Sequence, residues 1–249
     1  MITKKCLNLA VACVIGLSIV GLLAGSVLQA ADTAQPAAKV GPNGQKLVPL
    51  VEKLPRALFQ GTPKNLKPAP TLEKYVDKNR EPLYVPEGLT NLALNKKVTS
   101  SDTAPVIGEL TMVSDGDKEG ADGSFVELGP GTQWVQIDLG KPADIYALIV
   151  WHFHAEGRVY HDVVIQVADD ADFIENVKTV FNNDFDNSSG LGLGKNLEYI
   201  EDFRGKRFSA TNEKGQPVKG RYVRLYSKGN TSNDMNHYVE VEVFGKPAK

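Results

Sequence analysis

The sequence predicts an all-β protein: an antiparallel β-sandwich of jelly-roll type preceded by a proline-rich arm. Three runs in residues 134–170 support this prediction. Apolar and polar residues alternate in 135–139 and again in 163–167, which is the period of a half-buried strand. Residues 145–151 are apolar at every position, as in a strand with both faces covered. The turn signals that separate the three runs are Gly140, Pro142 and Gly157.

Further alternating segments continue the pattern on both sides of this stretch. We expect shorter strands at 98–100, 124–128 and 179–181, and longer ones at 221–226 and 238–244. In the last strand, valines alternate with Glu240 and Glu242, which we expect to point outward. Strands in this number can bury enough apolar surface to form a core without disulfides.

The first thirty residues predict export. Lys4 and Lys5 precede a stretch from Leu7 to Leu28 that is almost wholly apolar or small, and Ala30 offers a cleavage position. We interpret residues 1–30 as a signal peptide. An uncleaved anchor is the alternative, because about twenty apolar residues can span a bilayer. After cleavage we expect no membrane span and a secreted, periplasmic or cell-surface protein.

Composition excludes several classes of function. The chain has 249 residues, of which 23% are charged and 42% apolar, and its formal net charge is -2. Because no basic stripe or Lys/Arg run follows the leader, we expect no nucleic-acid partner. Cys6 and Cys13 both lie in the leader. The exported part therefore has no disulfide, no cysteine–zinc site and no cysteine nucleophile.

Residues 31–89 form the predicted arm. Prolines are too dense there for a long helix, but short amphipathic helices are expected at Leu50–Phe59 and Thr71–Asn79. The apolar residues of the arm have two interpretations: a spacer with some local helix, or a segment that docks on the domain or on a partner. The folded domain is expected at 90–246, with a tail at 247–249, and is expected to fold without the arm.

Six motifs in order give the folded domain a family resemblance. They are NLALNKKVTSS, SDGD, WVQIDLG, YHDVVIQVADD, RYVRLYS and VEVEVFG, and they cover roughly residues 91–246. Together they resemble the discoidin domain, the type C module of coagulation factors, which has the galactose-binding-like fold and is close to family 32 carbohydrate-binding modules. Two segments depart from the family. Asp169–Phe173 replaces its Asp-Gly and Trp, and residues 182–196 form a long Asn/Gly-rich loop.

The resemblance implies a secreted, non-catalytic module that binds a galactose-like or other surface glycan through loops at one end of the sandwich. A sugar site needs an aromatic face and planar polar groups, and residues 152–160 and 230–238 supply both. Ordinary polar loops are the alternative. The expected hydroxyl partners are His154 and Arg158, with Asn233 or His237 opposite, and the expected stacking platform is Tyr160 or Phe153.

The resemblance also implies a structural calcium ion between the Asp-Gly loop and the last strand. The implied oxygen ligands are Asp115 or Asp117, Ser124, and Glu240 or Glu242. The alternative is a simple turn beside two solvated glutamates. A second acidic loop, Asp184–Gly190, lacks the glycine and glutamate of an EF-hand, so we expect Asx turns there.

Two function classes remain open besides enzymes. The first is recognition of a carbohydrate or glycoconjugate, and the second is a structural or adhesion role with a protein partner in the cell envelope. A metal-dependent hydrolase using His152, His154 and Glu156 is a third interpretation. Because His-x-His alone lacks a hydrolase spacing, we expect no catalytic residues.

Overall fold

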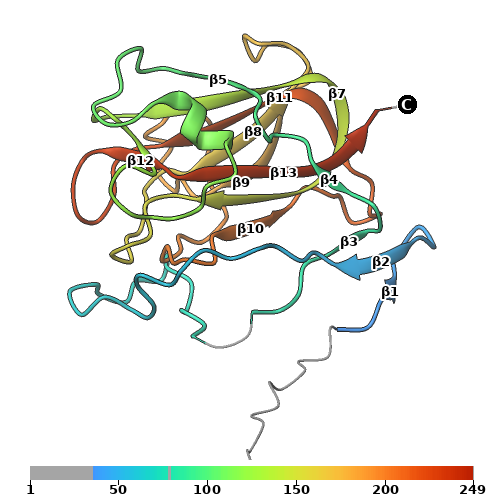
Figure 1. The fold of residues 1–249 in the computed structure, drawn as a ribbon, viewed down its shortest axis with the longest axis horizontal. Helices are drawn as coiled ribbons and strands as arrows, with labels where there is room; N and C mark the ends of the chain where they lie inside the picture. Colours follow the sequence, from blue (N-terminus) through green and yellow to red (C-terminus); the bar gives the residue numbers. More distant parts are fainter. Residues whose placement is uncertain (1–35, 78–79, 249) are drawn as a thin grey trace, which may run out of the picture. The chain divides into compact units, whose positions relative to one another are not determined.

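The computed structural model describes residues 36–77 and 80–248, so the predicted leader lies outside the described residues. Within Gln35–Lys249 the arm and the sandwich belong to one compact unit. Across the described residues, no helix is long and apolar enough to cross a membrane. The described residues are almost wholly strand and loop, and their one helix is the short 3-10 helix η1 at Leu110–Ser114 (Figure 1).

The predicted antiparallel β-sandwich is confirmed. An eight-stranded sheet has the order β4-β13-β7-β11-β8-β9, and β5 and β10 also pair with β7. Its strands are β4 (Thr90–Asn91), β5 (Lys97–Ser100), β7 (Gln133–Trp151), β8 (Val164–Ala168), β9 (Lys178–Asn182), β10 (Lys206–Ser209), β11 (Val218–Ser227) and β13 (Glu240–Pro247). A two-stranded sheet adds β6 (Val126–Leu128) and β12 (Asn236–Tyr238). Of these, β4, β10 and β12 were not predicted from the sequence.

Strand β7 corrects the prediction of two strands separated by a turn. It runs unbroken from Gln133 to Trp151, and residues 140–142 are an exposed bend within it rather than a break. Its first half pairs with β5 and β11, and its second half pairs mainly with β13 and β10. One strand therefore takes part in both layers of the sandwich. The register of β11 against it shifts between Gly220 and Tyr222, next to the bend.

The core lies between the two layers, and a second apolar cluster lies outside one of them. Inward residues such as Ile137, Leu148 and Val223 belong to the main cluster, and each is fully buried. Ile149 and Trp151 point to the opposite side of β7, yet they are fully buried as well. The prediction that both faces of residues 145–151 are covered is thereby confirmed.

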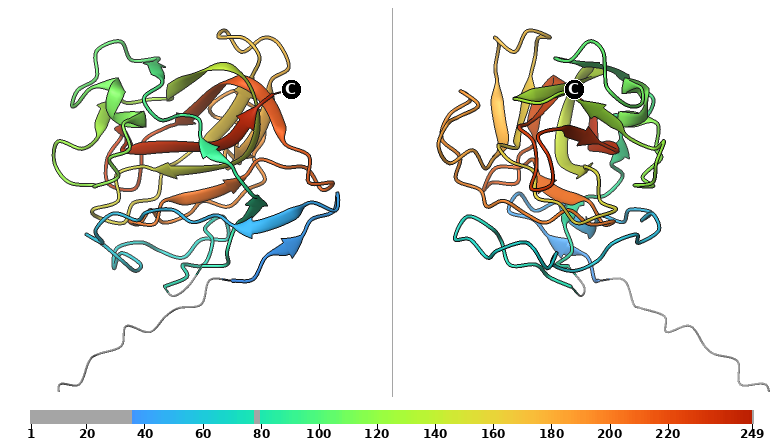
Figure 2. Two further views of the ribbon diagram at one scale, coloured as in Figure 1. Left: turned by 45° about the vertical axis from the view of Figure 1, so that its right-hand side comes forward. Right: turned by 90° about the vertical axis from the view of Figure 1, so that its left-hand side faces the viewer.

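The arm supplies part of that cover. Leu50 packs against the cluster of Ile149 and Trp151. The predicted helices are wrong for the described residues of the arm, which instead hold a three-stranded sheet of β1 (Lys39–Val40), β2 (Lys46–Pro49) and β3 (Tyr84–Pro86). In Figure 2 the arm, coloured blue to teal, lies beside the sandwich in both views. Proline density correctly excluded a long helix from the described part of the arm. It did not predict that the arm packs on the sandwich.

Candidate binding site at the junction of the arm and the sandwich

The structure brings four of the predicted ligand-binding residues together, but in the interior. Tyr160 Oη lies 3.0 Å from His237 Nδ1, and the Arg158 guanidinium lies 4.5 Å from the centre of the Phe153 ring. Each of these four residues is at most 9% exposed. Phe153 and Tyr160 therefore present no open ring face, which corrects their expected role as a stacking platform. Their contacts with one another are those of packed aromatic and charged side chains.

The other two predicted ligand-binding residues lie apart from that cluster. His154 is fully buried, and its Nε2 is 2.9 Å from the carbonyl oxygen of Lys118. It is therefore placed as an interior hydrogen-bonding residue and not as a hydroxyl partner on the surface. Asn233 is exposed, but its Oδ1 accepts hydrogen bonds from Asn230 Nδ2 (2.7 Å) and the Met235 amide (3.1 Å). These bonds close a turn.

The arm explains part of this burial. A Cβ atom built on Gly157 would lie 2.1 Å from the Phe59 ring, so the arm packs directly on the loop that was predicted to bind the ligand. The Arg56 amide donates to Glu119 Oε1 (3.2 Å), and Lys118 Nζ donates to the carbonyl of Lys53 (3.2 Å). This burial by the arm was not predictable, because no local sequence pattern identifies the residues that a distant segment will contact.

The residues expected to hold calcium partly converge. The Gly116 amide donates to Glu240 Oε2 (3.1 Å), which joins the Asp-Gly loop to the last strand. Glu240 Oε1 is buried and has no hydrogen-bond partner among the described residues. Burial raises the pKa of Glu240 to about 9. A buried carboxyl oxygen without a hydrogen-bond donor fits a cation, which would replace the proton and compensate the desolvation that raises this pKa.

Each of the remaining expected calcium ligands makes at least one polar contact within the protein. Glu242 pairs with Lys118 Nζ at 2.6 Å and is buried, so the outward, solvated position expected for both glutamates is corrected. Asp115 Oδ1 accepts from the Asp117 amide (2.8 Å), and Asp117 Oδ1 accepts from the Glu119 amide (2.9 Å). Ser124 donates its amide to the carbonyl of Ala121. Glu242 Oε2, like Glu240 Oε1, is buried without a hydrogen-bond partner among the described residues, so a calcium site here would rely first on Glu240 and Glu242.

A tighter acidic group lies in the loop that resembles a calcium loop. Carboxylate oxygens of Asp162, Asp184 and Asp186 lie within 4.8 Å of one another. Asp186 Oδ1 accepts a hydrogen bond from the Ser188 amide (2.9 Å), two residues on, as in the predicted Asx turns, and Asp184 accepts from the amides of Ser188 (3.0 Å) and Ser189 (2.9 Å). These carboxylates therefore order the loop from within.

A cavity of about 510 Å³ lies where the arm meets the sandwich, and we call it the junction cavity. The arm lines it with Glu73–Val76, Arg80 and Glu81, and the sandwich lines it with Tyr199–Asp202 and Arg204–Lys206. The sandwich residues belong to the loop that leads into β10. A volume of this size lies within the range of small-molecule sites.

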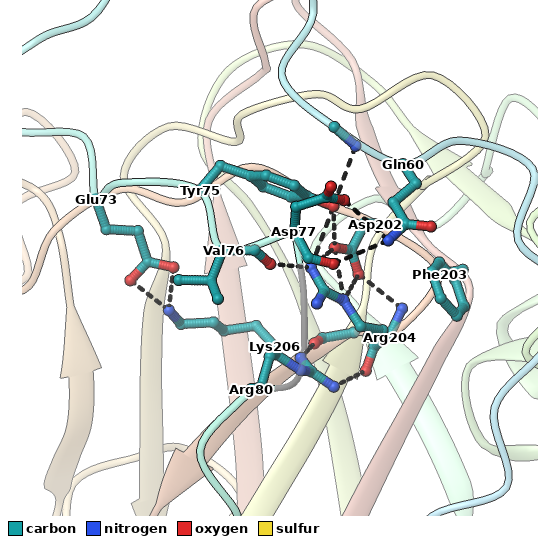
Figure 3. Close-up of polar contacts among 12 residues, drawn as sticks. Gln60, Glu73, Tyr75, Val76, Asp77, Arg80, Asp202, Phe203, Arg204 and Lys206 are labelled. Atoms are coloured by element: carbon teal, nitrogen blue, oxygen red, sulfur yellow. Dashed lines mark hydrogen bonds and ion pairs between the residues drawn. The ribbon is translucent and has the colours of Figure 1, made fainter. Parts of the chain in front are cut away.

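Polar contacts between the two walls hold the cavity in shape (Figure 3). Tyr75 Oη donates to Asp202 Oδ2 (2.9 Å), and Arg204 donates to Tyr75 Oη (3.1 Å) and to the carbonyl of Val76 (2.9 Å). Lys206 Nζ lies 2.6 Å from both carboxylate oxygens of Glu73. Because its hydroxyl is fixed by these bonds, the half-buried Tyr75 ring has a defined orientation.

The charges at the cavity are largely paired. Burial alone would raise the pKa of Asp202, but the hydrogen bonds and charge of Arg204 lower it below its ordinary value. Burial lowers the pKa of Arg80 to about 10, with the positive charges of Arg207 and Arg204 acting in the same direction. Burial also raises the pKa of Tyr199 well above its ordinary value, so this phenol stays protonated.

The lining combines charged groups with tyrosine and aliphatic side chains. It contains no serine, cysteine, threonine or histidine among the described residues. Three of its four carboxyl groups have an ion-pair partner: Asp202 with Arg204, Glu73 with Lys206, and Glu201 with His152 Nδ1 at 2.6 Å. The fourth belongs to Glu81. What the lining offers is tyrosine and aliphatic surface beside fixed polar groups.

Comparisons with known proteins concern the fold. No family model matches the chain, and no curated protein matches it. Among solved structures it is similar to a family 89 glycoside hydrolase from Clostridium perfringens, with 19% identity and a TM-score of 0.46, over 64% of this chain and 15% of that chain. It is also similar to the family 32 carbohydrate-binding module of AlyQ, with 20% identity and a TM-score of 0.40, over 59% of this chain and 93% of that one.

A fucolectin from striped bass serum has 20% identity and a TM-score of 0.43, over 64% of this chain and 49% of that chain. The matches thus include the kind of β-sandwich module that the sequence motifs resemble. At this level of similarity they concern the fold and not the ligand.

Proposed function

We propose that the protein is an exported, non-catalytic binding module whose ligand is a carbohydrate, bound in the junction cavity. The observation that carries the proposal is the composition of this cavity. Tyr75 and Val76 offer apolar surface. Beside them, Arg80 offers a planar guanidinium group and Lys206 offers an ammonium group with several N–H donors. Stacking on an aromatic ring together with fixed hydrogen-bonding groups is the chemistry by which proteins hold sugar rings.

The sequence motifs that resemble the discoidin domain support the same class of ligand. The resemblance places the ligand at the loops of one end of the sandwich. The residues expected to bind it there are buried, partly by one another and partly by the arm. We place the ligand at the junction because its lining residues leave a cavity, whereas the cluster around Tyr160 is packed. Affinity should be modest, because each contact to a sugar hydroxyl replaces a contact to water.

A structural calcium ion at Glu240 belongs to the same proposal. It would hold the Asp-Gly loop against β13, where the Gly116 amide already contacts the Glu240 carboxylate. The ion would supply positive charge to a buried carboxylate that otherwise stays protonated. Its contribution would be to stability, because Glu240 is not among the residues that line the junction cavity.

A glycan array with the purified protein, followed by titration calorimetry with the best ligand, tests the function. The Val76 side chain lines the cavity and is 54% exposed, so Val76→Glu should keep the fold while placing a carboxylate in the site. We expect affinity to fall at least about tenfold, since a charge without a partner must be desolvated on binding. Val40→Glu, at a 78% exposed valine of the arm outside the cavity, is the matched control.

Two results would contradict this proposal. Absence of binding to any glycan would remove the function, and unchanged affinity of the Val76→Glu variant would move the site elsewhere.

One observation favours a second candidate function, a protein partner in the cell envelope. The arm exposes Val51 (64%), Leu54 (41%) and Leu58 (36%) close together in the sequence. Exposed apolar residues that cluster on a surface are typical of interaction sites. Replacing these three residues with serine should abolish capture of such a partner and leave glycan binding intact. Recovery of proteins only, with no glycan bound, would favour this second function over the first.

A further inference from the structure

The two walls of the junction cavity come from segments far apart in the chain. Tyr75 and Asp202, which are hydrogen-bonded across the junction, are 127 residues apart in sequence. Among the described residues, an isolated parallel β-bridge between Leu72 and Glu198 joins the two segments here. The Glu73 amide donates to the carbonyl of Glu198 (2.9 Å), and the Glu198 amide donates to that of Thr71 (2.8 Å). The cavity therefore exists only while the arm lies on the sandwich.

The contacts that hold this part of the arm are mostly polar and charged. Arg204 and Lys206 reach from the sandwich to the arm, and Arg80 reaches back to the carbonyls of Arg204 (2.8 Å) and Gly205. Arg207, which does not line the cavity, donates to the carbonyl of Glu81 (3.2 Å) and lies 3.8 Å from Glu52. Among the described residues, the Lys206–Glu73 pair is the more exposed of the two ion pairs across the junction, with side chains 23% and 40% exposed, so salt should weaken it. The Arg207–Glu52 pair, with side chains 13% and 9% exposed, is screened less.

The Tyr75 hydroxyl links this segment to the rest of the arm. It accepts a hydrogen bond from the Gly61 amide (3.1 Å), and Gln60 Nε2 donates to the carbonyl and the carboxylate of Asp77 (3.0 Å each). Because Phe59 packs on Gly157 immediately before these residues, docking of the arm at the loop end and at the cavity should change together. The arm is thus one element with several weak attachments.

We infer that ligand binding and arm docking are coupled: the ligand binds the docked arm, and each stabilises the other. This inference rests on the proposed function. A ligand that touches both walls binds only the docked state, so by linkage it shifts the arm toward that state. A specific consequence follows for a ligand without charge. Salt should weaken its binding, because salt weakens the contacts of the arm rather than those of the ligand.

Calorimetry of the full chain with the strongest uncharged oligosaccharide from the array tests the coupling. From 50 mM to 500 mM sodium chloride we expect the affinity to fall about threefold or more. The Arg207→Gln variant, changed outside the cavity, should lose about threefold in affinity at low salt and show a flatter salt dependence. Arg221→Gln is the matched control, because Arg221 pairs with Asp138 at 2.7 Å, away from the arm.

Hydrogen exchange gives the reciprocal measurement. A saturating oligosaccharide should slow exchange of the Glu73 and Gly61 amides, whose acceptors are Glu198 and Tyr75. Glycan binding that is independent of salt, equal in Arg207→Gln and accompanied by unchanged exchange of these amides would overturn the coupling and leave the proposed function in place. Absence of binding to every oligosaccharide would overturn both.

Discussion

The arm and the sandwich differ in the kind of contact that holds them. The sandwich buries an apolar cluster between its layers, where Ile137, Leu148 and Leu225 are at most 1% exposed. The arm leaves Val40 and Val51 largely exposed and is attached by many hydrogen bonds and ion pairs, with Leu50, Phe59 and Val85 among its buried or packed apolar residues. Apolar burial dominates folding stability, whereas polar surface contacts contribute little each. The difference indicates a stable scaffold that carries a more weakly attached segment.

The largest expected difference in stability between the sandwich and the arm comes from a substitution in the core of the sandwich. Leu148 is fully buried in the second half of β7, so Leu148→Ala should lower the free energy of unfolding by about 3–5 kcal/mol through lost burial and a cavity. Val40→Ala in the arm should change it by less than about 0.5 kcal/mol. Urea denaturation followed by tryptophan fluorescence measures both. Similar losses in the two variants would mean that the arm and the core are not distinct in this way.

A second prediction concerns the pH dependence of stability in protein freed of calcium. The folded state raises the pKa of Glu240 from 4.5 to about 9, so the unfolded chain releases this proton at lower pH than the folded one. The contribution of Glu240 to the free energy of unfolding should therefore be highest below about pH 5 and fall as the pH rises toward 9. Each pH unit within that window costs up to about 1.4 kcal/mol.

The Glu240→Gln variant should remove that pH dependence. Between pH 6 and 8 we expect the wild type to lose about 2–3 kcal/mol relative to this variant in chelator. Calcium should restore the wild type at pH 8 and leave Glu240→Gln unchanged, because only a carboxylate binds the ion strongly. Melting temperatures from pH 5 to 9, with Glu87→Gln at an exposed glutamate as control, measure this. Parallel profiles of wild type and Glu240→Gln would contradict the prediction.

The smallest expected effect tests the contact between the two regions directly. Gly157 has a φ of 58°, and an added Cβ would meet the Phe59 ring, so Gly157→Ala should cost about 1–2 kcal/mol and loosen the arm. Gly190→Ala is the matched control, because Gly190 has a φ of 76° and open space around its Cβ position. The double variant Gly157→Ala/Phe59→Ala lacks the Phe59 ring. In that background, Gly157→Ala should lower the free energy of unfolding by no more than Gly190→Ala does. Exchange rates of the arm amides that stay equal in both glycine variants would exclude the contact.

The strands were predictable where one face is buried and the other is not. Alternation located β11, where the buried Val223 and Leu225 flank the less buried Arg224. It also located β8, although all five residues of β8 are buried. The continuity of β7 was not predictable, since glycine and proline mark a turn and an exposed bend in a long strand equally well. Glu240 and Glu242 alternate correctly with the valines, but their burial depends on the arm and on Lys118, which lie elsewhere in the chain.

The candidate site was harder to predict for a related reason. Polar residues such as His154 and Arg158 suggest a surface position, but here both are buried. Lys118 and Glu156 satisfy only some of their nitrogens, and His154 Nδ1 and Arg158 Nη1 have no hydrogen-bond partner among the described residues. The junction cavity depends on pairs such as Glu73 and Lys206, which are 133 residues apart. No local pattern identifies such partners. Dense charge and tyrosine in residues 73–81 and 199–206 were the only available signal.

The single long strand that enters both layers limits how the sandwich itself can move. The two layers cannot open like a hinge or slide past each other without breaking the hydrogen-bond ladders on both sides of β7. A mechanical load on one layer is carried through the backbone of Gln133–Trp151 into the other. The scaffold is therefore stiff in the directions in which two-layer proteins usually shear. Any adjustment to a ligand is left to the arm and the loops.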